Sequence, residues 1–364
     1  MSQRTLPNPA FWHGRKVFLT GHTGFKGGWL ALWLQQMGAK VTGYALAPDT
    51  LPALFTLADV ANGMHSVIDD IRDARAVADA LAEAEAEIVL HLAAQPLVRA
   101  SYADPLTTYA TNVMGTANVL EASRRVPSVK VVQVITTDKC YDNREWEYPY
   151  RETDRLGGHD PYSNSKACAE LVVDSYRRSF MTDAGIQLAS ARAGNVIGGG
   201  DWAADRIVPD CIRALLGEKP VDIRSPGAIR PWQHVLEPLS GYLVLAEQQY
   251  AGNPAAAGGF NFGPEPGNTV PVGELAAGML RHWGSGSLNI SGDPLKLHEA
   301  GTLKLDISKA RRHLGWQPRW DFDKTLFHTV DWYRRVLCHG EAARQVCLAQ
   351  IAQYHAADST PTQA

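Results

Sequence analysis

The stretch TGHTGFKGGWL (20–30) follows an apolar run, KVFLT (16–20), and opens a helical pattern that reaches Gln36. Its three glycines have the spacing GxxGxxG. Glycines let the backbone turn tightly and approach a pyrophosphate, whose charge is stabilised at a helix N-terminus. Such a spacing is common by chance among 32 glycines, but this one lies between a first strand and a first helix. The stretch therefore predicts a dinucleotide-binding turn, with a plain tight turn as the alternative.

The same alternation of strand and helix continues along the chain. Helices are predicted at 74–86, 105–125 and 161–181, between further strands at 40–46, 65–70, 87–94, 131–135 and 186–198. This spacing is typical of a parallel sheet covered on both faces, and we predict an α/β fold with a Rossmann-type, doubly wound sheet.

The pattern loosens after Gly198, where Gly and Pro are frequent, and a strand-like piece at 258–264 returns to the sheet. We therefore predict a smaller, discontinuous α/β lobe beside the sheet. The predicted units are a cofactor-binding domain (14–195 plus 232–264), a substrate-binding lobe (196–231 plus 265–335) and a flexible tail (355–364).

Composition disfavours several classes of protein. A net charge of −3 lacks the excess of positive charge that proteins use to bind a polyanion, so no nucleic-acid partner is expected. No apolar run reaches the ~20 residues of a membrane span, and the first residues lack a signal-peptide core. The five cysteines are scattered and odd in number, which suits reduced thiols in a cytosol and predicts no metal site. A cytoplasmic protein with no membrane partner is expected.

The second strand favours NAD over NADP as the cofactor. Tyr44, Ala45 and Leu46 stand where an acid would hold a ribose, and no arginine is present for a 2′-phosphate. Asp70, after the third strand, is either a partner for the adenine amine or a helix N-cap. The small residues of LHLAAQ (90–95) leave room for a cofactor against the sheet.

Candidate catalytic groups follow the strand in VVQVITTDKCYDNREW (131–146), which ends in two hydroxyls, Asp138 and Lys139. Charged groups at the carboxyl end of a buried strand are where α/β enzymes place their chemistry, although a solvated turn has the same composition. In YSNSK (162–166), Tyr162 and Lys166 share one helix face, where an ammonium favours the phenolate and so a base. A surface pair is the alternative.

Four motifs carry a resemblance to a known family. They are TGHTGFKG (20–27), TTDKCYDN (136–143), DPYSNSKACAELV (160–172) and RPWQHVLEPL (230–239). In this order they resemble the extended short-chain dehydrogenases/reductases over about 14–335, and among these the nucleotide-sugar 4,6-dehydratases, especially those acting on CDP-glucose. That family has Thr-Asp-Glu after the strand, whereas this chain has Thr137, Asp138 and Lys139.

The resemblance implies a redox-neutral dehydration of CDP-D-glucose to CDP-4-dehydro-6-deoxy-D-glucose, within deoxysugar synthesis for surface polysaccharides. Tyr162 is expected to take the O4 proton while NAD takes hydride from C4. Asp138 is expected to protonate the departing C6 hydroxyl and Lys139 to remove the C5 proton. An ordinary Lys has a pKa of ~10.4 and an ordinary Asp ~3.9, so both pKa values must shift on burial. A Lys139 that only orients the substrate remains an alternative.

The resemblance also implies three sets of site residues. The catalytic set is Thr137, Asp138, Lys139, Tyr162 and Lys166. The cofactor set is Gly21, Thr23, Gly24, Phe25, Lys26, Gly27, Asp70, Ile71, Leu92, Ala93, Ala94, Gln95, Asn112 and Thr136, together with Tyr162 and Lys166. The substrate set is Asn195, Asp201, Trp202, Arg206, Arg230 and His234. His22 is a further candidate for the cofactor phosphates.

The helices at 105–125 and 161–181 have apolar residues on more than one face, which predicts a homodimer through a four-helix bundle, or a tetramer. Alternative functions are a nucleotide-sugar 4-epimerase, a simple dehydrogenase, or a 4,6-dehydratase of a dTDP or GDP sugar. An NAD-binding regulator without catalysis is the alternative from another class. The epimerase and the dehydrogenase need Thr137, Tyr162 and Lys166 but not Asp138 and Lys139.

Overall fold

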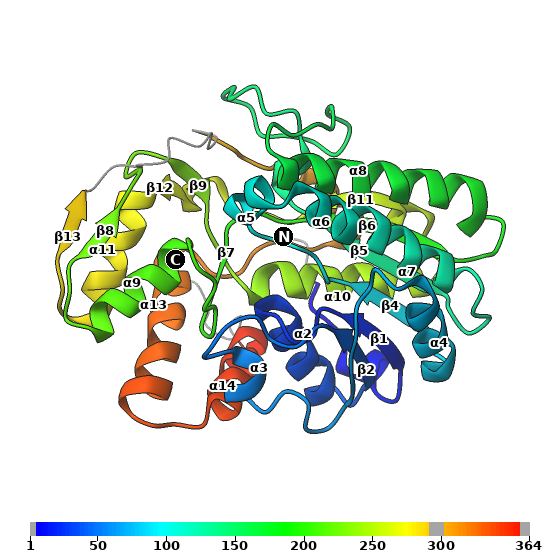
Figure 1. Ribbon diagram of the computed structural model, residues 1–364, viewed down its shortest axis with the longest axis horizontal. Helices are drawn as coiled ribbons and strands as arrows, with labels where there is room; N and C mark the ends of the chain where they lie inside the picture. Colours follow the sequence, from blue (N-terminus) through cyan, green and yellow to red (C-terminus); the bar gives the residue numbers. More distant parts are fainter. Residues whose placement is uncertain (1–4, 291–301, 357–364) are drawn as a thin grey trace, which may run out of the picture.

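The computed structural model describes residues 5–290 and 302–356 and has a seven-stranded parallel sheet at its centre (Figure 1). Long crossovers between neighbouring strands place helices on both faces, as the alternating sequence pattern predicts. In spatial order the strands are β11 (Gly258–Asn261), β6 (Gln187–Arg192), β5 (Val131–Ile135), β4 (Ile88–His91), β1 (Lys16–Thr20), β2 (Lys40–Ala45) and β3 (His65–Ile68).

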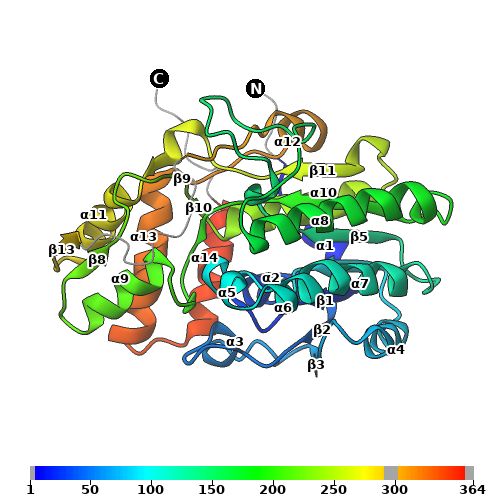
Figure 2. The same ribbon diagram turned by 45° about the horizontal axis from the view of Figure 1, so that its top comes forward.

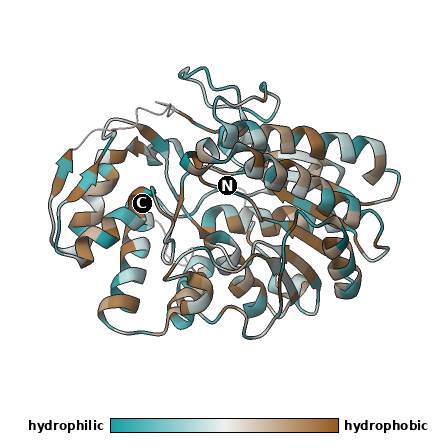
Figure 3. Ribbon diagram, viewed as in Figure 1, coloured by the Kyte–Doolittle hydropathy of each residue, from teal (hydrophilic) through white to brown (hydrophobic). Residues whose placement is uncertain are grey.

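Alternate residues of the strands fill two separate cores, one on each face of the sheet. Helices α2 (Phe25–Gln36) and α10 (Leu236–Tyr250) pack on one face, and α4 (Ala74–Ala84), α7 (Gly115–Ser123) and α8 (Pro161–Tyr176) cover the other (Figure 2). Hydrophobic residues are concentrated along the central strands (Figure 3). Because both faces are buried, the strands read as continuous apolar runs.

A smaller lobe lies beyond the carboxyl ends of β5 and β6. It contains short two-stranded sheets, β8 (Val221–Ile223) with β13 (Leu288–Ile290) and β9 (Ile229–Pro231) with β12 (Thr269–Pro271). Its helices are α9 (Ile207–Leu216), α11 (Val272–Trp283) and α13 (Phe322–Tyr333). The predicted lobe includes 291–301, which lies outside the described residues.

The strand predicted at 186–198 is in fact two strands. After β6 the chain breaks at Ala193–Asn195 and resumes as β7 (Val196–Ile197), which pairs with β10 (Gln233–His234). Asn195 takes a φ of 45°, which turns the chain out of the main sheet. The break directs the segment after β6 into the lobe.

Two further elements near the predicted boundaries differ from expectation. Helix α14 (Ala343–Ala356) was not predicted, and it packs against α2 with Tyr354 beside Trp33. It includes the first two residues of the predicted tail, and 357–364 lie outside the described residues. The N-cap of α4 is Asp73, whose carboxylate accepts from the backbone N–H groups of Arg75 and Ala76, so the N-cap interpretation of Asp70 was wrong.

No described helix is long and apolar enough to cross a membrane. Within 5–290 and 302–356, no group of three or more metal-ligating side chains is found.

Candidate active site

A cavity of about 820 Å³ lies at the carboxyl ends of β1, β4, β5 and β6 and is closed on its far side by the lobe. Parallel α/β sheets bind ligands at this edge. The cavity continues from the glycine turn before α2, past the end of β5, to the lobe residues after β7.

The glycine turn has no room for side chains at Gly21 and Gly27. Gly21 has a φ of 78°, and a Cβ there would lie 2.7 Å from the backbone N of Ala93. A Cβ on Gly27 would lie 2.0 Å from the carbonyl O of Gly21. Gly24 is the N-cap of α2 and supplies no side chain to that helix end. The helix N-terminus therefore faces the cavity without a side-chain cap, which suits the pyrophosphate of a dinucleotide.

The catalytic candidates lie together where β5 ends. Thr137 begins a short 3₁₀ turn (Asp138–Cys140), and its hydroxyl donates to Asp138 Oδ1 at 3.0 Å. Tyr162 and Lys166 reach the same place from α8, which Asp160 caps at its N-terminus. All five candidates line the cavity.

Asp138 is buried, with 1% of its surface exposed, and its Oδ2 atom has no hydrogen-bond partner within the described chain. Burial raises the pKa of this carboxyl, and the opposing charge of Lys139 does not cancel the effect. A Cβ on Gly194 would lie 1.7 Å from Oδ2, so the glycine at the β6 break makes the space for the carboxyl. Burial favours the protonated form that a general acid needs.

The two catalytic candidates on α8, Tyr162 and Lys166, have pKa values shifted in opposite directions. Burial raises the pKa of the Tyr162 phenol to about 12, opposed by a hydrogen bond with Thr137 and by the charge of Arg206. Burial lowers the pKa of Lys166 to about 8, and its Nζ donates to the carbonyl of Ile135 at 3.2 Å. The Lys166 side chain therefore holds the end of β5, a role that the spacing of the two residues did not predict.

Lys26 lies closer to the catalytic groups than expected. Its Nζ donates to the hydroxyl of Tyr242 at 3.0 Å. Burial and, after it, the charges of Lys166 and Arg206 lower the pKa of Lys26 to about 7. Asp138 acts in the opposite direction. Lys26 is thus electrostatically part of the catalytic end of the cavity.

Most members of the predicted cofactor set line the cavity, but two do not. Gln95 donates its backbone N–H to Asn112 Oδ1 at 2.8 Å, and Asn112 Nδ2 donates in turn to Ser165 Oγ at 2.9 Å. This pair joins the loop after β4 to α8, so both residues position the cavity wall. His22 is buried against Ser66 and also lies outside the lining. The lining members are Gly21, Thr23, Gly24, Phe25, Lys26, Gly27, Asp70, Ile71, Leu92, Ala93, Ala94, Thr136, Tyr162 and Lys166.

Five members of the predicted substrate set line the lobe side of the cavity: Asn195, Asp201, Trp202, Arg206 and Arg230. His234 does not. It is fully buried between Trp29 and Trp320 and accepts from the backbone N–H of Leu236, so its assignment to the substrate was wrong.

The lobe wall also contains charged residues that sequence reasoning missed. The predicted residues Arg206 and Asp201 pair at 2.9 Å. The missed residues are Asp205, Arg224 and Arg99, of which Asp205 pairs with Arg224 at 2.9 Å and with Arg99 at 3.8 Å. Arg99 comes from a helix (Val98–Ala103) remote from the lobe in sequence. No local motif predicts that Arg99 lies at the cavity, because the fold alone brings it close to Asp205.

Comparison with known proteins is decisive for the family. Residues 18–329 match the model of the family described as GDP-mannose 4,6 dehydratase.

The chain belongs to this family.

It is 51% identical over 329 residues to the CDP-glucose 4,6-dehydratase of Salmonella typhimurium, covering 89% of this chain and 92% of that protein. It is 32% identical to the dTDP-glucose 4,6-dehydratase of Streptomyces antibioticus, covering 73% and 75% of the two chains.

Solved structures confirm the Rossmann-type fold. The DesIV dTDP-glucose 4,6-dehydratase of Streptomyces venezuelae, solved with NAD and TYD bound, has a TM-score of 0.75 at 24% identity, with 88% of this chain and 97% of that chain covered. The UDP-glucose 4-epimerase of Thermotoga maritima has a TM-score of 0.77 at 21% identity, with 88% and 99% covered. At these identities the likeness concerns the fold, which dehydratases and epimerases share.

Proposed function

We propose that this chain is a CDP-D-glucose 4,6-dehydratase, an NAD-dependent lyase that forms CDP-4-dehydro-6-deoxy-D-glucose and water. The observation that carries the proposal is the Asp138 carboxyl, which is buried and has a raised pKa. It lies in one cavity with Lys139, Thr137 and Tyr162. The choice of the cytidine nucleotide is supported by the 51% identity to a CDP-glucose 4,6-dehydratase.

The residues of the glycine turn fit NAD. Gly21, Gly24 and Gly27 would hold its pyrophosphate, since side chains are excluded at Gly21 and Gly27 and the helix end at Gly24 has no side-chain cap. Asp70 and Ile71 would lie on the adenosine side, and Leu92, Ala93 and Ala94 along the sheet side. NAD, when bound, supplies an acceptor and donor of hydride and a positive ring that favours the nearby phenolate.

The first step would take place on the sugar C4 hydroxyl. Tyr162 would accept the O4 proton, and the Thr137 hydroxyl would share a hydrogen bond with the phenol and the substrate. Lys166 would contribute positive charge and hold the strand end through the Ile135 carbonyl. Thr136 would help to hold the same strand end, because its hydroxyl donates a hydrogen bond to Glu170 on α8.

The second step would remove water across C5 and C6. The ketone at C4 acidifies the C5 proton, which Lys139 would accept, while Asp138 would donate a proton to the departing C6 hydroxyl. The hydride taken from C4 would then return to C6 and a proton to C5, which gives the 4-dehydro-6-deoxy sugar without net redox change. Because burial favours the protonated Asp138, its assignment as the acid is supported by electrostatics. Lys139 is assigned as the base because it replaces the family carboxylate next to this acid.

The lobe would hold the nucleotide. Arg206 and Arg230 are candidates for the diphosphate, since a guanidinium grips phosphate oxygens in a bidentate manner. Asn195 and Asp201 lie on the same wall, and Trp202 offers an aromatic surface.

A 4-epimerase is the second candidate function, favoured by the fold-level likeness to such an enzyme. It needs Thr137, Tyr162 and Lys166, but it has no use for an acid that protonates a leaving hydroxyl. The buried Asp138, with Gly194 making space for it, favours the dehydratase.

The quaternary and cellular setting forms part of the same proposal. Large apolar side chains are exposed along the helices at 105–123 and 161–181: Leu106, Met114, Leu171 and Phe180. Such a surface favours a homodimer through a four-helix bundle, with a tetramer as the larger assembly. Light scattering gives the mass directly, and a monomer would contradict the dimer.

We place the enzyme in the cytoplasm, in deoxysugar synthesis for surface polysaccharide such as lipopolysaccharide.

The direct test is incubation of the purified protein and NAD with CDP-glucose, UDP-glucose, dTDP-glucose and GDP-mannose in parallel. The readout is the alkali-induced absorbance of a 4-keto-6-deoxy sugar. CDP-glucose is expected to react at least about ten-fold better than the others in kcat/KM, the discrimination that about 1.4 kcal/mol provides. Equal or better reaction with another nucleotide would overturn the cytidine assignment, and C4 inversion without dehydration would indicate the epimerase.

A further inference from the structure

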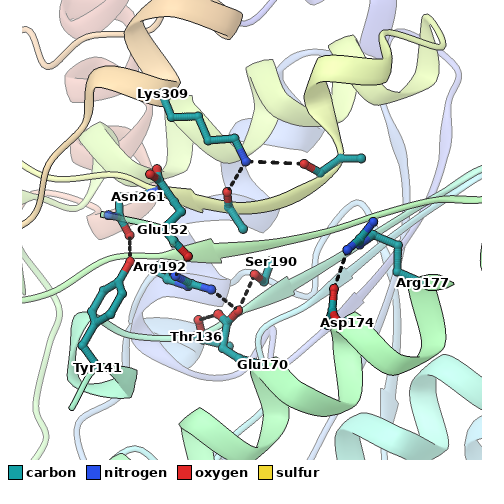
Figure 4. Close-up of polar contacts among 12 residues, drawn as sticks. Thr136, Tyr141, Glu152, Glu170, Asp174, Arg177, Ser190, Arg192, Asn261 and Lys309 are labelled. Carbon is teal, nitrogen blue, oxygen red and sulfur yellow. Dashed lines mark hydrogen bonds and ion pairs between the residues drawn. The ribbon is translucent and has the colours of Figure 1, made fainter. Parts of the chain in front are cut away.

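A buried carboxylate, Glu170, lies directly behind the catalytic end of β5. It follows Lys166 by one helical turn on α8 and is 4% exposed. Its Oε1 accepts a hydrogen bond from the Thr136 hydroxyl at 2.5 Å, and its Oε2 accepts from the Ser190 hydroxyl at 2.7 Å (Figure 4). The same Oε2 pairs with the Arg192 guanidinium at 2.7 Å. Neither the family motif roles nor the proposed chemistry uses this group.

The carboxylate is kept charged by its partners. Burial alone would raise the pKa of Glu170, but the charge of Arg192 and the hydrogen bonds from Arg192, Thr136 and Ser190 lower it overall. Arg192 is held in turn by the hydroxyl of Tyr141 and the carbonyl of Glu152 (Figure 4). A buried ion pair of this kind adds little net stability, so its presence calls for another explanation.

Glu170 and Lys166 bind two consecutive residues where β5 ends: Ile135 is the last residue of the strand, and Thr136 follows it. Lys166 donates to the carbonyl of Ile135, and Glu170 accepts from the hydroxyl of Thr136. The next two residues, Thr137 and Asp138, belong to the proposed catalytic set. Through Ser190 and Arg192, Glu170 also fixes β6, which ends at the break where Gly194 leaves space for Asp138. One helix turn therefore sets the position of both strand ends around the acid.

Glu170 also acts on the charge of Lys166. Burial lowers the pKa of the lysine, whereas Glu170, followed by Cys140, raises it, which leaves a pKa of about 8. Other titratable groups face Lys166 from the surrounding elements. They are Tyr162 on α8, His91 on β4 and Lys26 on α2. Glu170 is the carboxylate among the groups that raise the Lys166 pKa.

We propose that Glu170 is a positioning residue, which holds the end of β5 through Thr136 and keeps Lys166 charged during the reaction. The inference rests on the proposed function, because it concerns the same reaction. It separates two effects of one side chain: a geometric effect through the hydrogen bond to Thr136 and an electrostatic effect on Lys166.

The main test is Glu170→Gln, which keeps the shape and removes the charge. Its kcat is expected to fall about 10²-fold, the cost of a small misplacement of catalytic groups. The carboxylate raises the Lys166 pKa, so its loss lowers that pKa. As the pH rises, Lys166 then loses its proton, and the enzyme its activity, at a lower pH than in the wild type. The basic limb of the kcat/KM profile should therefore move to lower pH. A folded Glu170→Gln protein with wild-type kcat and an unmoved basic limb would overturn the proposal.

Two further variants keep the test decisive. Glu170→Asp retains the charge but shortens the reach, so kcat should fall while the basic limb stays in place. The double variant Glu170→Gln, Arg192→Met removes both charges of the buried pair, so that no unpaired charge is left in the interior. The basic limb of its kcat/KM profile should still be shifted to lower pH. Glu237→Gln is the matched control, because Glu237 is an equally buried carboxylate bonded to Arg319, Trp320 and Tyr354, away from Lys166. A shift in the control equal to that in Glu170→Gln would also overturn the proposal.

Titration of Lys166 itself separates this inference from the proposed function. Competitive labelling of lysines with acetic anhydride across a pH series, followed by mass spectrometry, reports the amine pKa without substrate. Glu170→Gln should label Lys166 at lower pH than the wild type does. If CDP-glucose is not a substrate but this shift appears, the proposed function fails and the electrostatic link stands. An unchanged labelling profile would contradict that link.

Discussion

The two walls of the cavity differ in how they hold charge. On the sheet wall, Asp138 and Lys166 are 1% and 6% exposed and have pKa values shifted by burial. On the lobe wall, Arg230 and Asp201 are also buried, but Arg224 and Asp205 pair with each other while their side chains remain 30% and 48% exposed. Exposed pairs are screened and exchange partners at little cost, whereas buried groups keep fixed positions and altered proton affinities. The sheet wall is therefore suited to proton transfer and the lobe wall to binding an anionic ligand.

This contrast predicts that changes on the sheet wall lower kcat and that changes on the lobe wall raise KM. The largest effect is expected for Tyr162→Phe, which removes the group that takes the O4 proton. Loss of a general base typically costs about 10²–10⁴-fold, and kcat with CDP-glucose should fall by about 10³-fold or more. Tyr250→Phe, at the far end of α10, is the control. A Tyr162→Phe enzyme that retains a tenth of wild-type kcat would contradict the assignment.

Asp138→Asn should stop the reaction after the first step. The amide fills the space beside Gly194 but has no proton to give to the leaving hydroxyl. Oxidation at C4 should persist, seen as absorbance of reduced nicotinamide bound to the enzyme, while dehydration falls about 10²–10³-fold. Asp142→Asn, in the loop after the site, serves as the comparison variant. Equal loss of both steps in Asp138→Asn would show that the carboxyl acts on the whole site and not on the leaving group.

Lys139→Met tests the base. Methionine keeps much of the side-chain length without a titrating group, and Thr137, Tyr162 and Lys166 remain in place. The variant should form reduced cofactor on mixing with CDP-glucose and then stall, with uptake of deuterium at C5 from heavy water lowered about 10²-fold. Near-normal C5 exchange would remove Lys139 from the mechanism and leave it the role of orienting the substrate.

Substitutions on the lobe wall should raise KM for CDP-glucose. Arg230→Ala removes a guanidinium from the proposed diphosphate site, and loss of one partner of a buried charge pair costs about 2–5 kcal/mol. KM for CDP-glucose is expected to rise by about 30-fold or more, while NAD affinity changes little. Arg281→Ala is the control, since its side chain is 67% exposed and pairs with Asp323 away from the cavity. Unchanged KM for Arg230→Ala would give Arg230 a structural role.

Sequence reasoning described the sheet wall better than the lobe wall, for a physical reason. Strand ends and helix starts carry local patterns, so the glycine turn, the end of β5 and Tyr162 with Lys166 could each be predicted from neighbouring residues. The residues of the lobe wall meet through the fold, as when Arg99 reaches Asp205 from another element. His234 has a polar side chain but is buried among aromatic rings, a position that no local pattern reveals. Helix α14 has little amphipathic character, and its place is set by packing against α2.

The position of Glu170 shows the same limit. Its spacing from Lys166 is visible in the sequence, but its partners are Ser190 and Arg192 of β6 and Thr136, which follows β5. A carboxylate at this spacing on a helix is most simply read as an exposed charge. Only the three-dimensional arrangement assigns it to the buried region behind the acid.

The central claim is a redox-neutral dehydration in which the hydrogen removed from C4 returns to C6 of the same sugar. The most direct test is to supply CDP-glucose deuterated at C4 with a catalytic amount of NAD, and to locate the deuterium by NMR and mass spectrometry. The account predicts a CDP-4-dehydro-6-deoxy sugar with deuterium at C6, formed over many turnovers without net accumulation of reduced nicotinamide. Deuterium retained at C4 of an epimerised sugar, or released in stoichiometric reduced cofactor, would contradict it.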